Sequence, residues 1–304
     1  MKYLKCLTIS LAVLISNNLY GQNIQKSKAS LKGESFSFYY RLPAEKTEGI
    51  LVLLPGWGES PQSIFKKTEL PAVLAQRGYL TVVPELKRTL FADDFQLAEI
   101  DLMISMLKEK HSLGAIPLVI GGLSAGGSVA IGYAEYLLSE GKNSGLKAVF
   151  VIDPPLDLER MYISSERKIK YACLGLVQKE GVFIKNYLEN ALGGSPVSKP
   201  DEYLKRSSFS ANAVDGGRAK FLKNIPVRLY AEPDLEFVRK TYCSDLQFDD
   251  INATDLEKLN KFLQQAGNTR SEYIATKGKG FHSWNIPEAK DCADWILKSG
   301  NQQH

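Results

Sequence analysis

The pentapeptide Gly122-Leu-Ser-Ala-Gly126 places a serine between two glycines at the spacing G-x-S-x-G. A serine hydroxyl is a poor nucleophile unless it is held clear of its surroundings and a base removes its proton. A sharp turn from a strand into a helix exposes such a serine, and small residues two positions before and after it relieve backbone crowding. The apolar run Ile116–Ile120 precedes the turn and a helical pattern at Ser128–Leu138 follows it. We therefore predict that Ser124 is a nucleophile; the plainer alternative is a glycine-rich turn with a solvated serine.

Short apolar runs and amphipathic stretches alternate along the rest of the chain. This alternation predicts an α/β fold with a doubly wound, mostly parallel sheet and right-handed crossovers. The expected strands are Ile50–Leu54, Tyr79–Val83, Ile116–Ile120, Ala148–Ile152, Val227–Tyr230 and Ser271–Ala275. The expected helices are Leu70–Arg77, Leu97–Lys110, Ser128–Leu138, Asp255–Gln265 and Pro287–Lys298. Phe36–Arg41 is expected to be an antiparallel edge strand.

The segment between Asp153 and Val227 is too long for a simple crossover and is rich in Tyr, Lys and Ser. We expect a mainly helical lid at about residues 156–222, inserted into a single domain that spans residues 22–304. Open α/β sheets bind their ligands beyond the carboxyl ends of the strands. The lid is therefore expected to cover that edge of the sheet.

From Ile50 to the C-terminal helix, the chain resembles the α/β-hydrolase superfamily, especially its secreted and dienelactone-hydrolase-like esterases. The motifs that carry the resemblance are Leu51-Val-Leu-Leu-Pro-Gly-Trp-Gly-Glu-Ser60, the Gly122–Gly126 turn, Pro226-Val-Arg-Leu-Tyr-Ala-Glu-Pro-Asp234 and Gly280-Phe-His-Ser-Trp284. The resemblance implies a serine hydrolase that cleaves carboxylic esters through an acyl-enzyme on Ser124. A serine peptidase on the same fold and a catalytically silent binding module are the alternatives.

The base can be assigned because the chain has only three histidines. Hydrolases of this type carry their catalytic groups in the chain order Ser, acid, His. His111 precedes Ser124, and His304 is the last residue of a polar tail. His282 lies in a glycine-framed loop after the last expected strand, where the resemblance implies the catalytic histidine. The alternative is a loop histidine that packs between its aromatic neighbours.

The acid must accept a hydrogen bond from the second imidazole nitrogen of the base. The resemblance favours Asp234, which follows the expected strand Val227–Tyr230. Asp153, at the end of the preceding strand, is the alternative acid, and Glu232 is third. Three more carboxylates precede the histidine and stay open as candidates: Asp245, Asp249 and Asp250.

Attack on a carbonyl creates an oxyanion, which backbone N–H groups stabilise. Ala125 follows the nucleophile and is expected to supply one donor. The stretch Pro55-Gly56-Trp57-Gly58 resembles the family's H-G-x-G, with proline in place of histidine, and implies that Trp57 supplies the second. The alternative is a plain glycine-rich turn in which Trp57 is a packing residue.

The composition is that of an ordinary globular protein, with 44% hydrophobic and 24% charged residues. A formal net charge of +4 is too balanced to indicate a nucleic-acid partner. No sequence motif calls for a nucleotide cofactor or a metal. The expected substrate is a small-molecule or carbohydrate-linked ester.

The first 21 residues have a basic start, a short apolar run and a polar exit, which predicts a cleaved signal peptide. The expected location is therefore secreted or periplasmic, without a stable membrane span after processing. Removal of the signal leaves Cys173, Cys243 and Cys292, which allow at most one internal disulfide. Three unpaired buried thiols are the alternative.

Overall fold

The computed structural model describes residues 24–142, 145–173 and 175–300. The predicted signal peptide lies outside these residues. Within them, no helix is both long enough and apolar enough to cross a bilayer.

One sheet of eight strands, in the order β1-β2-β4-β3-β5-β6-β7-β8, runs through the described part of the chain. The strands are β1 (Gln25–Leu31), β2 (Glu34–Arg41), β3 (Gly49–Leu54), β4 (Tyr79–Pro84), β5 (Leu118–Leu123), β6 (Leu146–Ile152), β7 (Val227–Ala231) and β8 (Ser271–Ala275). The strands β3 to β8 pair in parallel, whereas β2 pairs antiparallel with both β1 and β4. The carboxyl ends of six strands therefore meet at one edge.

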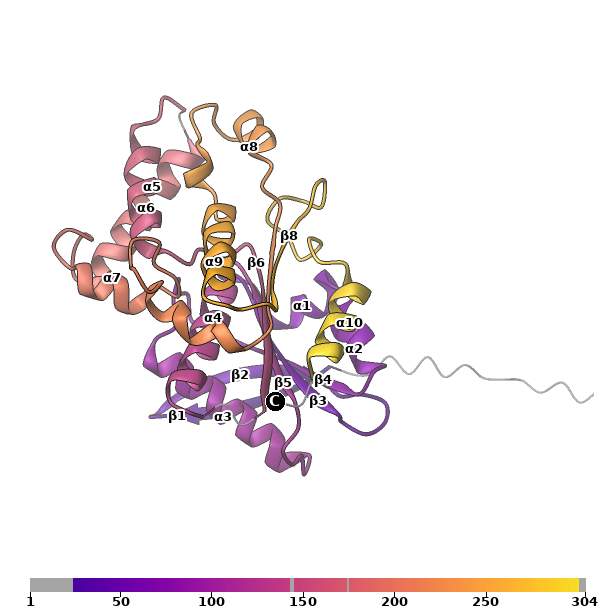
Figure 1. The fold of residues 1–304 in the computed structure, drawn as a ribbon. Coiled ribbons are helices and arrows are strands. Elements are labelled where there is room, and N and C mark those ends of the chain that lie inside the picture. Colours follow the sequence, from indigo (N-terminus) through magenta and orange to yellow (C-terminus); the bar gives the residue numbers. More distant parts are fainter. Residues whose placement is uncertain (1–23, 143–144, 174, 301–304) are drawn as a thin grey trace, which may run out of the picture.

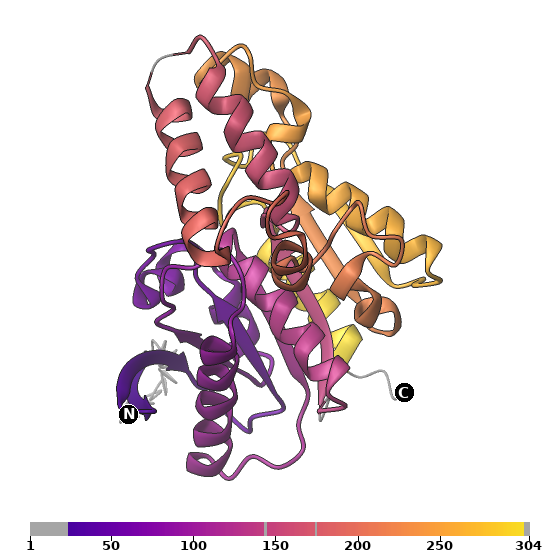
Figure 2. The same ribbon diagram turned by 90° about the vertical axis from the view of Figure 1, so that its left-hand side faces the viewer.

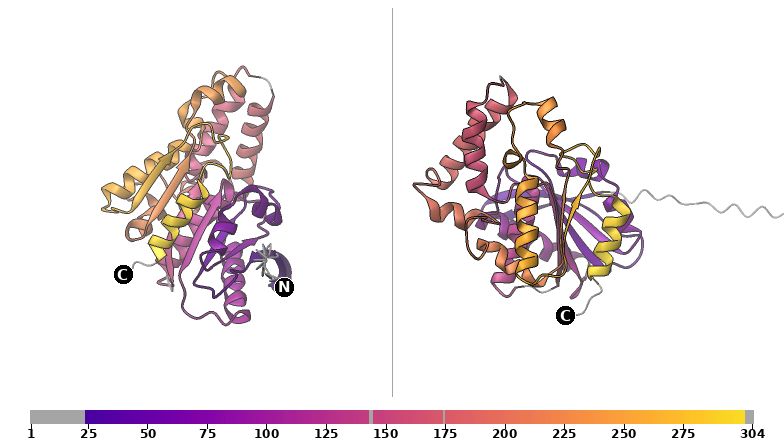
Figure 3. Two further views of the ribbon diagram at one scale, coloured as in Figure 1. Left: turned by 90° about the vertical axis from the view of Figure 1, so that its right-hand side faces the viewer. Right: turned by 45° about the horizontal axis from the view of Figure 1, so that its top comes forward.

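Helices cover both faces of this sheet (Figure 1). One face carries α3 (Asp94–Lys110), α4 (Ala125–Ser139) and α9 (Ala253–Gln265), which Figure 2 shows from the front. The other carries α1 (Pro61–Lys67), α2 (Leu70–Ala75) and α10 (Ala289–Gly300); α10 lies across the sheet in the left view of Figure 3. All residues of β3, β4, β5 and β7 are buried, as expected of strands that are covered on both sides.

The expected lid segment contains α5 (Leu158–Lys170), α6 (Leu176–Leu192), α7 (Pro200–Arg206) and the 3₁₀ helix η1 (Gly217–Asn224). The antiparallel pair α5 and α6 stands beyond the carboxyl ends of the strands, at the top of Figure 1. The short helix α8 (Leu235–Thr241) and the 3₁₀ turn η2 (Phe248–Asp250) lie at the same end. We refer to α5 and α6 together as the helical wall.

The α/β class and the mostly parallel sheet are confirmed, and three local expectations are corrected. The strand β2 is antiparallel as predicted but is not at the edge, because β1 pairs with its outer side. The fifth strand begins at Leu118, since Pro117 has no N–H for the ladder, and continues through Gly121 and Gly122. The short helices α1 and α8 were not predicted.

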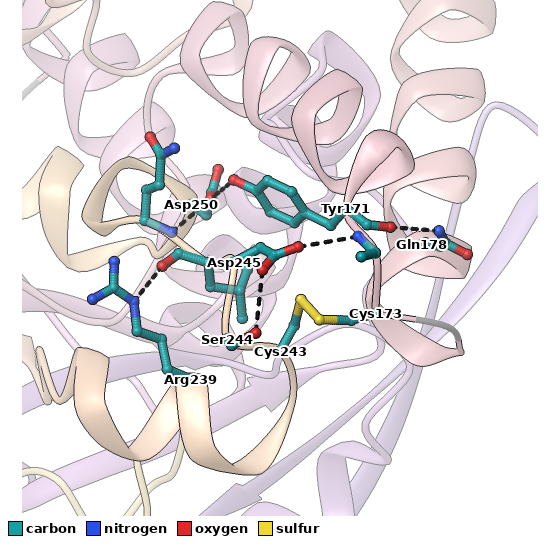
Figure 4. Close-up of a disulfide and its surroundings, with 11 residues drawn as sticks. Tyr171, Cys173, Gln178, Arg239, Cys243, Ser244, Asp245 and Asp250 are labelled. Atoms are coloured by element: carbon teal, nitrogen blue, oxygen red, sulfur yellow. Dashed lines mark hydrogen bonds between the residues drawn. A yellow bond between two sulfur atoms is a disulfide. The ribbon is translucent and has the colours of Figure 1, made fainter.

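A disulfide joins Cys173, between the two helices of the wall, to Cys243, just after α8 (Figure 4). Hydrogen bonds reinforce this junction: the Ala172 N–H donates to Asp245 Oδ2 at 3.0 Å, and Gln178 Nε2 donates to the Tyr171 carbonyl at 2.7 Å. Cys292 is a free, buried thiol. The bond thus fastens the tip of the wall to a segment that follows β7.

Reduction of this disulfide should destabilise the protein. The bond closes a sequence separation of 70 residues, and a cross-link of this kind typically contributes about 2–4 kcal/mol. We expect dithiothreitol to lower the free energy of unfolding by about that amount, measured by denaturant titration. The double variant Cys173→Ser/Cys243→Ser is the control, because its unfolding curve should not respond to the reductant. An unchanged wild-type curve after verified reduction would contradict the expectation.

Candidate active site

Ser124 occupies the sharp turn between β5 and α4, with φ 54° and ψ −129°. This conformation is rare for a residue with a side chain and costs of order 1–3 kcal/mol unless its surroundings enforce it. The Ser124 N–H donates to the Ile152 carbonyl of β6 at 2.8 Å, which anchors the turn to the neighbouring strand. The Ser124 side chain makes no capping hydrogen bond to α4. Its hydroxyl is therefore not used by the helix that it precedes.

The two glycines that flank Ser124 are required by close backbone contacts. A Cβ atom on Gly126 would lie 2.3 Å from the carbonyl oxygens of Leu54 and Pro55, at the end of β3. A Cβ atom on Gly122 would lie 2.6 Å from the carbonyl carbon of Gly126. The structure thus supplies the steric reason for the G-x-S-x-G spacing and brings the β3 loop against the turn.

His282 pairs with Asp153. The distance between His282 Nδ1 and Asp153 Oδ2 is 2.5 Å, and the Asp153 side chain is 7% exposed. Asp153 directly follows β6; its N–H donates to the Tyr230 carbonyl, and its carbonyl accepts a hydrogen bond from Asn252 Nδ2 at 3.0 Å. These two hydrogen bonds hold the backbone of Asp153, and thereby the position from which its carboxylate reaches the imidazole.

Asp234, the acid favoured by the resemblance, has a different partner. Its Oδ1 accepts a hydrogen bond from the Phe237 N–H at 2.9 Å, so that Asp234 is the N-cap of α8. The structure thus pairs His282 with Asp153, the alternative acid, and the role of either aspartate in catalysis stays a prediction. The physical reason is that the loop after β8 extends past the end of β7, and His282 reaches the end of β6.

The remaining acid candidates have other partners. Glu232 accepts hydrogen bonds from the N–H groups of Lys279 and Phe281, in the loop that carries His282. Asp250 is ion-paired with Arg167. The others bond outside the His282 pair: Asp245 to Ala172 and Asp249 to Thr254 and Lys258.

Two opposing effects act on the pKa of His282. Burial lowers it, but the hydrogen bond from Nδ1 to Asp153 and the negative charge of that carboxylate raise it, with smaller contributions from Glu180 and Glu59. The net pKa of His282 is raised above its ordinary value. The imidazole is thus a stronger base than a free histidine.

Ser124, Asp153 and His282 all line one pocket of about 510 Å³. Residues of the helical wall line another side of this pocket. Apolar side chains dominate the lining: Trp57, Leu90, Met161, Leu176, Val177, Phe183, Ile184, Val238, Tyr242, Leu246, Ile251 and Phe281. Trp57 packs edge-on against Phe183 and Tyr187 of α6, with ring centroids 5.6 and 5.3 Å apart.

Several polar side chains of the pocket are bonded to other protein groups. Arg160 donates to Asp255, with Nε 2.8 Å from Oδ1. Ser164 Oγ donates to Asp250 Oδ1 at 2.8 Å, and Lys168 pairs with Glu180 at 3.0 Å. More of the pocket surface is apolar than polar.

The predicted oxyanion donors lie on two elements that meet at the turn. Ala125 is the first residue of α4, and the first N–H groups of a helix have no acceptor within it. Trp57 lies in the loop after β3, next to Gly56, whose N–H donates to Glu59 Oε2 at 2.7 Å. The role of the Trp57 and Ala125 amides in catalysis stays a prediction.

The only cluster of candidate metal ligands among the described residues is Cys173, Cys243 and Asp245. Its two sulfurs form the disulfide and offer no thiolate. None of these three residues belongs to the pair of Asp153 and His282. Sequence reasoning did not single out Glu59, which contacts Gly56 and Trp284, and it considered Glu232 only as an acid, not as an acceptor for the N–H groups of the His282 loop.

Comparisons with models of protein families and with the sequences of curated proteins find no match. Solved structures do match. Carboxyl esterase 2 from the fungus Tuber melanosporum superimposes with a TM-score of 0.60, over 93% of this chain and 89% of that one, at 17% identity. A fungal esterase from Rhizomucor miehei gives a TM-score of 0.61, over 91% of this chain and 84% of that one, at 14% identity.

A soluble variant of the monoglyceride lipase from Saccharomyces cerevisiae, solved with a substrate analogue, is also similar. It superimposes with a TM-score of 0.57, over 92% of this chain and 96% of that one, at 16% identity. Similarity at such low identity concerns the fold. It extends beyond the four sequence motifs to nearly the whole described chain, which therefore has the α/β-hydrolase fold.

Proposed function

We propose that this protein is a serine hydrolase that cleaves carboxylic esters of small molecules through an acyl-enzyme on Ser124. The observation that carries the proposal is the 2.5 Å pair of His282 Nδ1 and Asp153 Oδ2, which lines the same pocket as Ser124 in its strained turn. Esterases and a lipase among the proteins of similar fold support the same reaction class.

In the proposed acylation step, His282 Nε2 takes the proton of Ser124 Oγ while Oγ attacks the carbonyl carbon of the ester. Asp153 holds the imidazole in the Nδ1–H tautomer and stabilises the imidazolium. The amides of Trp57 and Ala125 stabilise the oxyanion. The carbon–oxygen bond then breaks, and the alcohol leaves with the proton from His282.

Deacylation repeats these roles with water. The water oxygen attacks the acyl carbon while His282 takes a proton from the water. The bond between the acyl carbon and Ser124 Oγ then breaks, and His282 returns a proton to Oγ. The products are a carboxylic acid and the free enzyme. Over the two steps, one ester and one water are consumed, and one alcohol and one carboxylic acid are released.

The pocket favours an ester with an apolar acyl or alcohol part. Its volume of about 510 Å³ lies within the range of small-molecule sites. Trp57, Phe183 and Ile184 offer apolar contacts. Two polar pairs of the lining, Ser164 with Asp250 and Lys168 with Glu180, are bonded to each other. A carbohydrate-linked ester would have to bind with its sugar part toward solvent.

A secreted or periplasmic location is part of the proposal. The basic and apolar start of the sequence supports it, and so does the disulfide between Cys173 and Cys243. Disulfides persist mainly in oxidising compartments.

Labelling with a fluorophosphonate tests the proposal directly. The probe should modify wild-type protein and fail to modify Ser124→Ala, because only an activated serine attacks it. Short acyl esters and the matching peptide amides should then be compared as substrates; faster cleavage of the amides would favour the peptidase alternative. Folded wild-type protein that resists the probe would instead support a silent binding module.

The two aspartates should behave differently when each is changed to asparagine. Asp153→Asn should lower kcat by about 10⁴-fold, since the amide favours the wrong imidazole tautomer. Asp234→Asn should leave kcat nearly unchanged, because asparagine caps a helix about as well as aspartate. Steady-state kinetics on one ester measures both. A larger loss in Asp234→Asn would show that the acid is Asp234 after all.

The pH profile should reflect the raised pKa of His282. The neutral imidazole is the active base, so kcat/KM should rise with pH through this pKa, with a midpoint above 6.5. In Asp153→Asn the effect of burial remains without the opposing carboxylate, and the midpoint of the residual activity should move to lower pH. Equal midpoints in the two proteins would be inconsistent with the pair.

A further inference from the structure

The carboxylate of Glu59 lies between the two loops that carry the proposed oxyanion donor and the proposed base. Its Oε2 accepts a hydrogen bond from the Gly56 N–H at 2.7 Å and another from Trp284 Nε1 at 3.0 Å. Glu59 and Trp284 are 225 positions apart in the sequence. On its outer side, Oε1 pairs with Lys67 at 2.5 Å. The Glu59 side chain is only 16% exposed.

The first of these loops follows β3 and contains Gly56, the residue before Trp57. The Glu59 N–H donates to the Gly56 carbonyl at 3.1 Å while its side chain accepts from the Gly56 N–H, so both backbone groups of Gly56 are held by one residue. A Cβ atom on Gly56 would lie 3.1 Å from Glu59 Oε2, and glycine permits this approach. The orientation of the Trp57 amide therefore depends on Glu59.

The second loop runs from β8 to α10 and contains no helix or strand at His282. Upstream of His282, Glu232 holds the N–H groups of Lys279 and Phe281, at 2.6 and 3.2 Å. Downstream, Trp284 is buried in the core on the α1, α2 and α10 face of the sheet, and its indole N–H bonds to Glu59. The loop is thus fixed on both sides of the base.

We propose that Glu59 is a positioning residue that couples the oxyanion loop to the His282 loop, so that donor and base keep a fixed relative geometry. The inference rests on the proposed function.

A structural alternative is that Glu59 merely forms an ion pair with Lys67. Lys67 is 46% exposed, and pairs at such sites contribute little. The contacts with Gly56 and Trp284 differ in kind, because removing the carboxylate would leave two N–H groups without their acceptor, one of them on a buried indole. Variants can separate the two interpretations.

Four variants form the test: Glu59→Ala, Glu59→Gln, Trp284→Phe and the control Lys67→Met. Glu59→Ala should lower kcat about 100-fold with little change in KM, because loosened catalytic groups affect the transition state more than substrate binding. Glu59→Gln should recover most of this loss, since its amide oxygen can take the place of Oε2 toward both N–H donors. Lys67→Met should resemble wild type.

Trp284→Phe removes the indole N–H but keeps an aromatic ring, so the hydrogen bond to Glu59 is lost while part of the packing is kept. We expect a smaller loss of kcat than in Glu59→Ala. The double variant Glu59→Ala/Trp284→Phe should be no worse than Glu59→Ala, because contacting residues that act together are non-additive. Additive losses would overturn the proposal.

Hydrogen exchange measured on the full chain supplies a readout that does not depend on activity. In Glu59→Ala, amides in peptides covering residues 55–60 and 276–286 should both exchange faster, while Lys67→Met leaves both unchanged. Faster exchange in one loop alone, or equal effects of Glu59→Ala and Lys67→Met, would overturn the coupling.

The two proposals fail in different ways. Wild-type protein that cleaves no ester and binds no fluorophosphonate would refute the proposed function, and the exchange experiment would still decide whether Glu59 couples the loops. An active wild type with an equally active Glu59→Ala variant would refute the positioning role alone.

Discussion

The close contact between the first turn of α4 and the end of β3 is the constraint on which the site depends. The carbonyls of Leu54 and Pro55 approach Gly126 so closely that no side chain fits there. This contact presses the N-terminus of α4 and the β3 loop against the same turn. Ser124 has its strained conformation in this turn, and Trp57 and Ala125 lie on the two elements that touch.

Strain and buried charge are concentrated at the same place. Among the described residues, five non-glycine residues have positive φ, and three of them are Ser124, Asp153 and Phe281. Such conformations persist only where the surroundings enforce them. Here the surroundings are fully buried strands on one side and, beyond the pocket, a helical wall held by a disulfide and by the buried pair of Arg160 and Asp255.

The elements that sequence patterns predicted well are those with strong periodicity. The central strands and the helices α3, α4, α9 and α10 were found because their apolar residues repeat at the spacing of a buried strand or an amphipathic helix. The edge strand β1 was missed because it is mostly exposed, and α1 and α8 because seven residues are too few to show a helical period. The fifth strand was placed too early because Gly121 was not recognised as part of it; Gly121 packs under the Phe150 ring.

The sequence by itself was enough to predict a nucleophile and a base. Ser124 lies in a motif whose spacing follows from local backbone sterics. With only three histidines, chain order set aside His111 and the tail position set aside His304, which left His282. The acid was different, because Asp153 and Asp234 both follow strands that end at the same edge. Only the tertiary structure shows which of them pairs with His282, because that contact joins residues 129 positions apart in the chain. The same holds for Glu59, whose link to Trp284 no spacing rule could predict.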